Sequence, residues 1–123
     1  MKIETCNTFT ATIYCGLKKG YDETSITDYP SRIRLAREIC QTMCNEKGLG
    51  LTFNTTEFIY TDGNELGIEV GLINYPRFPR TQTEIKHISQ ELAKQLMEAL
   101  QQYRVSVVYP DFTIMLENEE ITE

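Results

Sequence analysis

The sequence predicts an α+β domain with a ferredoxin-like, split βαβ arrangement, in which an antiparallel sheet carries two helices on one face. Two observations predict it. Segments of strand period alternate with two segments of helical period in the order β, α, β, β, α, β, with a possible extra β at the end. The chain has 123 residues, 41% of them hydrophobic, which suits one domain better than two. Residues 1–116 are therefore predicted to form a single ligand-binding domain.

The first strand is predicted over residues 3–15, which are rich in threonine and β-branched residues and alternate between apolar and polar from Phe9 onward. Residues 16–30 have no hydrophobic period, so a surface loop is predicted there. A helix follows, with Ser31 as its N-cap, and Gly48 supplies a left-handed stop at its end.

Two strands joined by a tight turn are predicted next, over residues 49–61 and 65–74. The turn is predicted at 61–64, where an Asp-Gly pair tolerates the positive φ angles of a short hairpin. A second helix is predicted to begin where Thr81 or Thr83 can cap it, and Glu84 stands three residues after Thr81, as in a capping box.

The C-terminal part contains two short β-rich runs, 105–109 and 112–116, separated by Pro110 and Asp111. We predict one bent edge strand with a turn or bulge at these two residues. Residues 117–123 contain four glutamates and are predicted to be an acidic, frayed tail.

The charge balance disfavours nucleic acid as a partner. Twelve Lys and Arg against eighteen Asp and Glu leave a formal charge of −6, and a negative body repels a phosphate backbone. No segment approaches the roughly twenty apolar residues that span a bilayer, and the N-terminus lacks the apolar run of a signal peptide. We therefore expect a cytoplasmic protein without a membrane partner.

The four cysteines are interpreted as reduced thiols in or near the core, because a chain of this length and apolar content needs no disulfides. Cys40 and Cys44 share a helix face, but no second pair of ligands lies at metal-site spacing. No metal site and no cofactor are predicted.

Catalytic residues are not predicted either. The single histidine, His87, lies one position off the apolar stripe of the second helix and should face water, and no familiar nucleophile or phosphate-loop motif is present. Glu57, Glu65 and Glu69 are the carboxylates within the two strands of the predicted hairpin, and we interpret them as solvent-facing. The chain is therefore predicted not to be an enzyme.

The connector 74–80, with the sequence Asn-Tyr-Pro-Arg-Phe-Pro-Arg, has the parts needed to hold a nucleotide. Its two prolines stiffen it, its arginines offer forked donors to phosphate, and its aromatic rings can stack a base. The alternative is a crossover in which Tyr75 and Phe78 only plug the core beneath the second helix.

Three residues near the C-terminus complete the candidate set. Arg104, at the start of the fourth strand, is a third candidate phosphate partner, and Tyr109 and Asp111 could bind ribose or a base edge. The predicted ligand-binding residues are Asn74, Tyr75, Arg77, Phe78, Arg80, Arg104, Tyr109 and Asp111.

A resemblance to a known protein family rests on three segments of the chain, residues 56–64, 71–80 and 104–111. On these segments the chain resembles the first-described Thoeris anti-defence family of phages, over nearly its whole length from Phe9 to Asn118. The resemblance implies a sponge in the cytosol of the bacterial host. Such a protein would bind a cyclic ADP-ribose (glycocyclic ADPR) immune signal, sequester it without cleaving it, and so keep the Thoeris effector inactive.

The small size of the domain favours a shared site. Little room exists for an enclosed pocket, so we predict a homodimer or higher homo-oligomer with ligand sites at its interface. Two other functions stay open: an allosteric small-molecule-sensing module, and a small metal-dependent phosphodiesterase that uses strand carboxylates.

Overall fold

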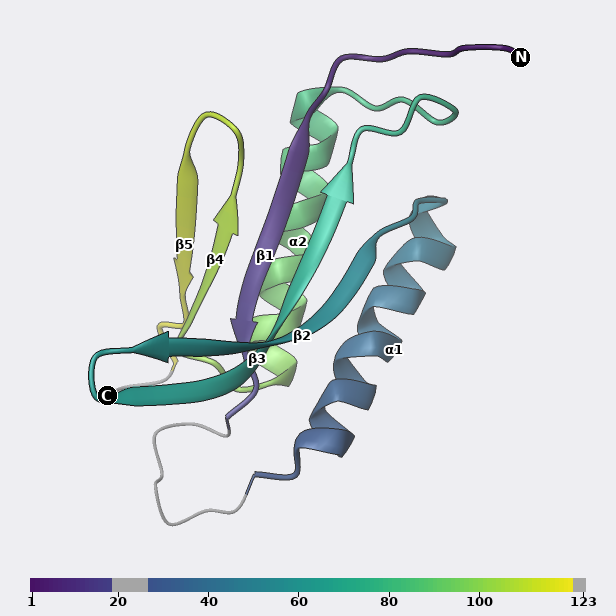
Figure 1. The fold of residues 1–123 in the computed structure, drawn as a ribbon. Helices are drawn as coiled ribbons and strands as arrows, with labels where there is room; N and C mark the ends of the chain where they lie inside the picture. Colours follow the sequence, from purple (N-terminus) through teal and green to yellow (C-terminus); the bar gives the residue numbers. More distant parts are fainter. Residues whose placement is uncertain (19–26, 121–123) are drawn as a thin grey trace.

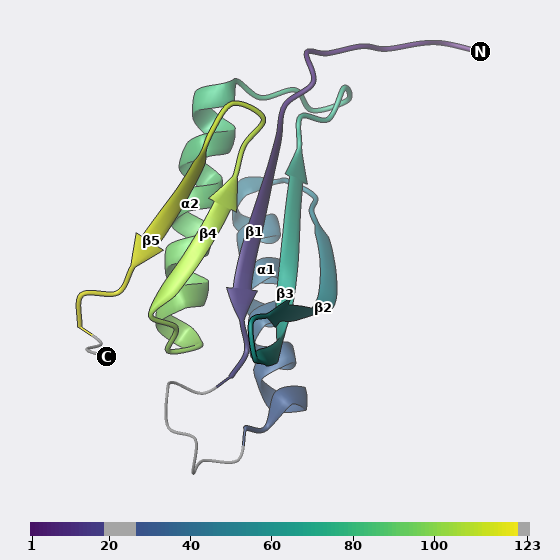
Figure 2. The ribbon, with the colours of Figure 1, turned by 60° about the vertical axis from the view of Figure 1, so that its left-hand side comes forward.

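A computed structural model of the protein describes residues 1–18 and 27–120. Its strands form one antiparallel sheet in the order β2-β3-β1-β4-β5, and both helices lie on the same face of it (Figures 1 and 2). This confirms the predicted α+β, ferredoxin-like class, with β5 as the extra strand. The elements are β1 (Thr10–Gly16), α1 (Tyr29–Lys47), β2 (Thr52–Tyr60), β3 (Gly63–Ile73), α2 (Gln82–Ala99), β4 (Arg104–Val108) and β5 (Thr113–Glu117).

The core lies between the sheet and the helices. Alternate residues of β1, such as Ala11 and Ile13, are buried against the helices, as the period of two requires. The stripe of α2 that faces them includes Ile85, Leu92 and Leu96, all buried. The register of the ladders keeps this alternation through β3 and β4, so one face of the sheet supplies nearly the whole core.

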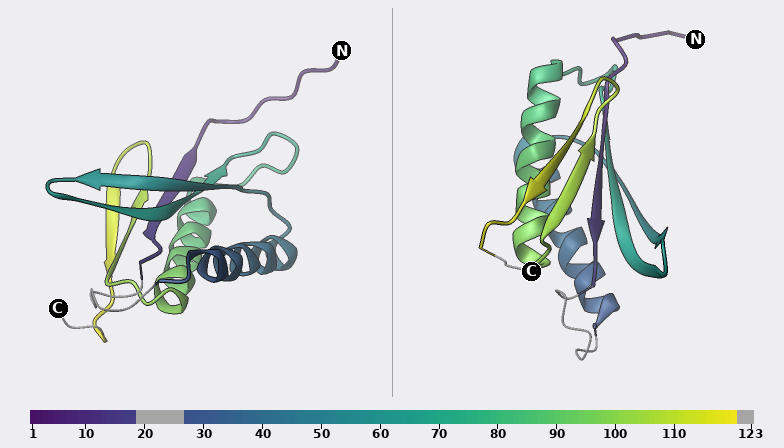
Figure 3. Two further views of the ribbon diagram at one scale, coloured as in Figure 1. Left: turned by 60° about the horizontal axis from the view of Figure 1, so that its bottom comes forward. Right: turned by 90° about the vertical axis from the view of Figure 1, so that its left-hand side faces the viewer.

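The other side of the sheet carries no helix, as the right-hand view of Figure 3 shows. We call this side the open face. It presents Thr12 and Tyr14 of β1 together with their partners Gly71 and Glu69 of β3. These residues are half-buried by their neighbours rather than packed under another layer.

β1 is shorter than predicted, because residues 3–9 do not belong to a strand. The ladder begins with Thr10 opposite Ile73, the last residue of β3. Beyond it, the backbone N–H of Asn74 still donates to the carbonyl of Phe9, at 2.8 Å. The N-terminal residues then leave the body of the fold (Figure 1). Strand propensity was present, but no partner strand continues opposite it.

α1 begins earlier than predicted. Asp28, not Ser31, is the N-cap: its side chain accepts a hydrogen bond from the backbone N–H of Ser31, at 3.2 Å. Pro30 fits the first turn, where no backbone donor is needed, so the helix extends through it. Gly48 ends α1 with φ of 64°, as predicted. Residues 19–26 of the predicted loop lie outside the described residues.

The capping box predicted for α2 is confirmed by reciprocal hydrogen bonds between Thr81 and Glu84. The prediction of one bent C-terminal strand is wrong, because β4 and β5 are two strands paired as a hairpin. The N–H of Tyr109 donates to the carbonyl of Phe112 and closes the turn that holds Pro110 and Asp111. β5 extends through Glu117, so only residues after it can form the predicted tail, and 121–123 lie outside the described residues.

The β2–β3 hairpin is longer than the strands beside it. β1 pairs with β3 only as far as Gly67, so residues 57–66 extend beyond this ladder, and we call them the arm. The arm turns away from the direction of β1 and crosses the sheet on the side without helices (Figures 1 and 3). At its tip, Asp62 takes the positive φ of 57°. Glycines let aromatic rings lie across the arm, since a Cβ on Gly67 would collide with the Phe58 ring.

None of the four cysteines, all of which lie among the described residues, forms a disulfide in the structure. Burial raises the pKa of Cys15 and of Cys40 to about 12, so both stay protonated at neutral pH. In the part of the chain that the structure describes, neither helix is long and apolar enough to cross a bilayer.

The close packing at Gly67 gives a stability prediction. A Cβ there would also lie 2.8 Å from the backbone carbonyl oxygen of Cys15, which cannot move away cheaply. We expect Gly67→Ala to lower the free energy of unfolding by about 1–3 kcal/mol in urea denaturation. The control is Gly50→Ala, because a Cβ at Gly50 meets nothing within 4 Å. Equal stability of the two variants would contradict the packing argument.

Candidate functional site

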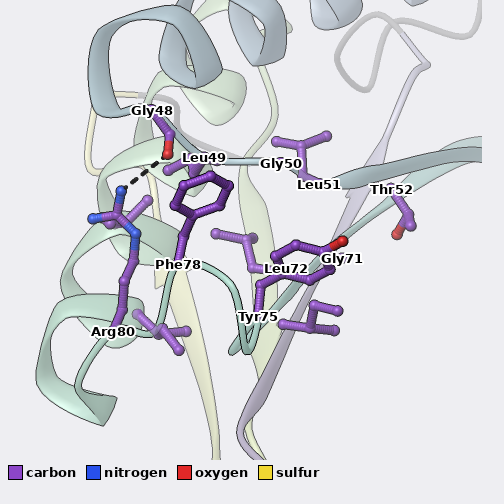
Figure 4. Close-up of a pocket in the computed structure, with 13 residues that line it drawn as sticks. Gly48, Leu49, Gly50, Leu51, Thr52, Gly71, Leu72, Tyr75, Phe78 and Arg80 are labelled. Atoms are coloured by element: carbon purple, nitrogen blue, oxygen red, sulfur yellow. Dashed lines mark hydrogen bonds between the residues drawn. The ribbon is translucent and has the colours of Figure 1, made fainter. Parts of the chain in front are cut away.

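A cavity of about 520 Å³ lies where the end of α1, the start of β2, the end of β3 and the start of α2 meet (Figure 4). Its walls are mostly apolar. The residues that line it are Gly48, Leu49, Gly50, Leu51, Thr52, Gly71, Leu72, Ile73, Tyr75, Phe78, Arg80, Ile85 and Ile88. Its size and apolar character are typical of small-molecule sites.

Asn74 fixes the loop that forms one wall of this cavity. Its side-chain N–H donates to the carbonyl of Asn7, and its side-chain oxygen accepts from the backbone N–H of Arg80, both at 2.8 Å. The first and last residues of the 74–80 connector are thereby joined. Asn74 is a support for the loop, and it does not line the cavity.

The two aromatic residues of the loop lie at the cavity. The backbone N–H of Phe78 donates to the carbonyl of Tyr75, at 2.9 Å, so these residues close a β-turn with Pro76 at its second position. Their rings are nearly parallel, 22° apart, with centroids separated by 6.4 Å. Tyr75 is 51% and Phe78 59% exposed. Two large rings held at a cavity mouth offer a stacking surface rather than a plug for the core.

Arg80 lines the same cavity, and one end of its guanidinium is engaged by backbone carbonyls. Its guanidinium donates to the carbonyl of Gly48 (Figure 4) and to that of Lys47, at 2.6 Å, and it forms an ion pair with Glu84. These carbonyls are the unsatisfied acceptors at the end of α1, where positive charge is favoured. Arg80 therefore caps the C-terminal end of α1, and the hydrogen bonds to these carbonyls compete with binding of a phosphate.

Arg77 lies outside the cavity wall, with its guanidinium 5.5 Å from the centroid of the Phe78 ring. Arg104 lies at the opposite end of the sheet, where it pairs with Glu117, at 3.4 Å. Within one chain the structure therefore does not bring the three predicted phosphate partners together. β4 begins at the end of the sheet where β3 also begins, so Arg104 is a strand length away from the loop after β3.

Tyr109 and Asp111 lie at the same end as the cavity, but they contact α2. The Tyr109 hydroxyl is buried and lies 2.7 Å from that of Ser89. Asp111 pairs with the ammonium of Lys86, at 3.5 Å. The same ammonium lies 4.6 Å from the centroid of the Phe112 ring, a cation–π contact. These contacts attach the β4–β5 turn to the helix.

The cavity wall also contains residues that the sequence did not single out, at the connection 48–51 and at Thr52 and Gly71. The sequence contained a signal for this wall, because Leu49, Gly50 and Leu51 directly follow the predicted helix stop at Gly48. A Cβ on Gly71 would press against the Thr52 hydroxyl, so this glycine keeps the cavity open toward the open face.

Acidic residues continue the open face next to the cavity. Along β3, Gly67, Glu69, Gly71 and Ile73 all point to this face, and so does Glu65 on the arm. Glu69 is two residues from Gly71, which corresponds to about 7 Å along a strand. Its cross-strand neighbour Tyr14 packs edge-on against Phe58, with ring centroids 6.4 Å apart. Carboxylates and aromatic rings together suit a positively charged group.

Burial raises the pKa of Glu65, although the charge of Lys18 opposes the shift. The residues that the structure describes contain no cluster of three or more His, Cys, Asp or Glu able to hold a metal ion. His87 is exposed and lies 3.9 Å from Glu91, in agreement with the prediction of a surface histidine.

No protein-family profile and no curated protein matches the chain. Solved structures do match its fold. A phage SAM lyase in complex with S-methyl-5'-thioadenosine superposes with a TM-score of 0.73 and 17% identity, over 99% of this chain and 98% of the other. A phage SAM lyase in the apo state gives a TM-score of 0.62 and 19% identity, over 90% of each chain. The resemblance to the Thoeris family is not confirmed by these comparisons.

The prediction that this chain is not an enzyme is overturned by the comparison, because the structures that share its fold over nearly its whole length are lyases. The sequence argument failed because it looked for a side-chain nucleophile or base, and not every bond cleavage needs one. Two coarser features of the prediction agree with these structures: they are phage proteins, and one of them holds a small adenosine-containing ligand.

The position of Glu65 gives a pH prediction. Folding raises the pKa of the Glu65 carboxyl above its ordinary value of 4.5, so the folded protein holds this proton more tightly than the unfolded chain does. The free energy of unfolding therefore falls as the pH rises from the unfolded pKa of Glu65 to its folded pKa, because the buried carboxylate is then charged. We expect Glu65→Gln to be more stable than the native protein near neutral pH. The difference should vanish under acidic conditions, as measured by urea denaturation across pH. A variant that is less stable at neutral pH would contradict this assignment.

Proposed function

We propose that the chain is a lyase that cleaves S-adenosylmethionine and releases S-methyl-5'-thioadenosine, with the adenosine part bound in the cavity beside Tyr75 and Phe78. The observation that carries the proposal is the fold shared over the whole chain with a SAM lyase that holds this nucleoside. A fold hosts many functions, so the properties of the site itself must also fit.

The size and lining of the cavity fit the nucleoside. A volume of about 520 Å³ is sufficient for an adenosine with a short thioether. Tyr75 and Phe78 offer faces on which adenine can stack, and the leucine and isoleucine side chains of the walls suit the thiomethyl group.

The charge of the site favours a nucleoside over a nucleotide. Among the described residues that line the cavity, Arg80 alone is charged; its Nη2 donates to the carbonyls of Lys47 and Gly48, and its charge is balanced by the carboxylate of Glu84. A diphosphate would require free cationic donors at this position. S-adenosylmethionine instead carries a sulfonium and an ammonium, and Glu69 on the open face is placed to attract them.

The chemistry requires little from the protein. Release of S-methyl-5'-thioadenosine breaks the bond between the sulfonium sulfur and the γ-carbon of the methionine part, and the bonding electrons go to sulfur. The γ-carbon can be taken by the carboxylate of the same substrate, which closes a lactone and balances the charge without water. Catalysis then rests on orientation and exclusion of solvent, and this accounts for a site without a classical nucleophile.

Loss of S-adenosylmethionine deprives host methyltransferases of their methyl donor, and this is consistent with an anti-defence role in the host cytosol. Both the role and the location are part of the proposal. The homo-oligomer with ligand sites at its interface also remains a proposal, and the exposure of Tyr75 and Phe78 at the cavity mouth supports it.

The test is to incubate the purified protein with S-adenosylmethionine and to quantify S-methyl-5'-thioadenosine by liquid chromatography and mass spectrometry. We expect turnover by the native protein. Tyr75→Ala and Phe78→Ala should each lower kcat/KM about 5- to 150-fold, because a lost stacking face costs about 1–3 kcal/mol. Glu69→Gln should raise KM for the cationic substrate.

The control is Arg104→Ala, at the opposite end of the sheet, which should retain native turnover within about twofold. Recovery of intact S-adenosylmethionine from the native protein would overturn the proposed function.

A further inference from the structure

Residues 6–9 lie outside the sheet, yet they are held beside the 74–80 connector (Figure 1). We call residues 6–9 the strap. Its last residue, Phe9, is buried and stacks on the ring of Tyr109, with ring centroids 6.0 Å apart and 20° between the ring planes. The three residues before Phe9 are exposed or half-buried. The strap is therefore anchored in the core at one end, and the rest of it lies on the surface.

Asn74 joins the strap to the connector, and all four of its polar groups take part. Its backbone N–H donates to the carbonyl of Phe9 and its side-chain N–H donates to that of Asn7, both at 2.8 Å. Its backbone carbonyl accepts from the thiol of Cys6, at 3.3 Å. Its side-chain oxygen accepts from the backbone N–H of Arg80. Three of these hydrogen bonds lead to the strap, and the fourth closes the connector.

The side chain of Asn74 therefore has two separate roles. An amide donates in one direction and accepts in another, whereas a carboxylate only accepts and a methyl group does neither. The donor reaches the strap, and the acceptor reaches the end of the connector. Substitution can separate the roles, because Asn74→Asp keeps the acceptor and loses the donor, and Asn74→Ala loses both.

The other side of the strap is not packed closely. A cavity of about 400 Å³ is lined both by Cys6 and Asn7 of the strap and by Gln82 and Glu84 of α2. The strap and the first turn of the helix are thus separated by open space. The position of the exposed part of the strap depends on its hydrogen bonds to Asn74.

We propose that the strap positions Tyr75 and Phe78 for their ligand, and that Asn74 is the positioning residue through which it acts. Tyr75 directly follows Asn74, and the hydrogen bond of the turn ties Phe78 to Tyr75, at 2.9 Å. Both rings are more than half exposed, so the core gives them little support. Without the strap, the first residue of the connector loses three of its four hydrogen bonds. The attachment of the strap stands independently of the proposed function, whereas its effect on the ligand rests on it.

The attachment is tested by hydrogen–deuterium exchange of the full chain, read by mass spectrometry. We expect Asn74→Asp to speed exchange about 2- to 12-fold in peptides that cover residues 6–9 and 74–80, because a net hydrogen bond is lost there. Peptides from β4 and from the second half of α2 should keep the native exchange rates. Native exchange in the strap, or faster exchange throughout the chain, would overturn the proposal.

Asn74→Ala is the matched comparison, because it also removes the hydrogen bond from the backbone N–H of Arg80. We expect both variants to speed exchange in the strap, since both lose the donor to Asn7. If Asn74→Ala speeds exchange and Asn74→Asp does not, closure of the connector alone holds the loop, and the strap has no positioning role.

The effect on the ligand is tested by steady-state turnover of S-adenosylmethionine. A displaced stacking surface weakens substrate binding, so we expect Asn74→Asp to raise KM about 2- to 12-fold at nearly unchanged kcat. A variant that is partly unfolded would instead lose kcat at unchanged KM. Asn118→Asp is the matched control, because it adds the same charge at the opposite end of the sheet, next to the last residue of β5.

Native KM in Asn74→Asp, or a loss of kcat alone, would overturn the role of the strap in the site. An equal rise of KM in Asn118→Asp would also overturn it, because the added charge would then be the cause. Absence of turnover by the native protein would overturn the proposed function, and the exchange experiment would still decide the attachment of the strap.

Discussion

Burial of apolar surface on one face of the sheet is the constraint on which the rest of this structure depends. Each helix connects parallel strands of the same sheet, and the right-handed crossover places both helices on the same side. Alternate residues of β1, β3 and β4 therefore form the core with α2. The residues between them face outward, free to be glycine, threonine or glutamate. The open face is a consequence of how the core is built.

The cavity lies where the connection from α1 to β2 passes the edge of the sheet. α1 ends at Gly48, and the short connection 48–51 must pass the edge of the sheet before β2 can begin. The gap is bordered on its far side by the 74–80 loop, which Asn74 holds in place. The guanidinium of Arg80 donates to a carbonyl at the end of α1, and the other residues of the cavity wall are uncharged, so the cavity is mostly apolar. Such a site suits a ligand that is itself uncharged where it is buried.

Periodicity and caps were enough to predict the fold class, the capping box at Thr81 and the helix stop at Gly48. The proline, arginine and aromatic content of the 74–80 connector, rather than any period, pointed to Tyr75, Phe78 and Arg80, which line the cavity. Strand propensity gave wrong bounds in two segments, because a strand also needs a neighbouring strand to pair with. Residues 3–9 have no strand opposite them, and residues 105–116 fold back on themselves as a hairpin. The phosphate role of Arg80 could not be judged from sequence, because its acceptors at Lys47 and Gly48 are more than thirty positions away. The prediction that the chain is not an enzyme rested on the absence of familiar motifs, and the solved structures that share its fold are lyases.

The central claim is that the cavity holds an adenosine without phosphate. The most direct measurement compares the calorimetric affinity of the native protein for S-methyl-5'-thioadenosine and for cyclic ADP-ribose in the same buffer. The account predicts that the thioether nucleoside binds at least about tenfold more tightly, a difference of about 1.4 kcal/mol, because Arg80, the one cation among the described residues of the cavity wall, is held by the end of α1 and by Glu84. Tighter binding of cyclic ADP-ribose would contradict it.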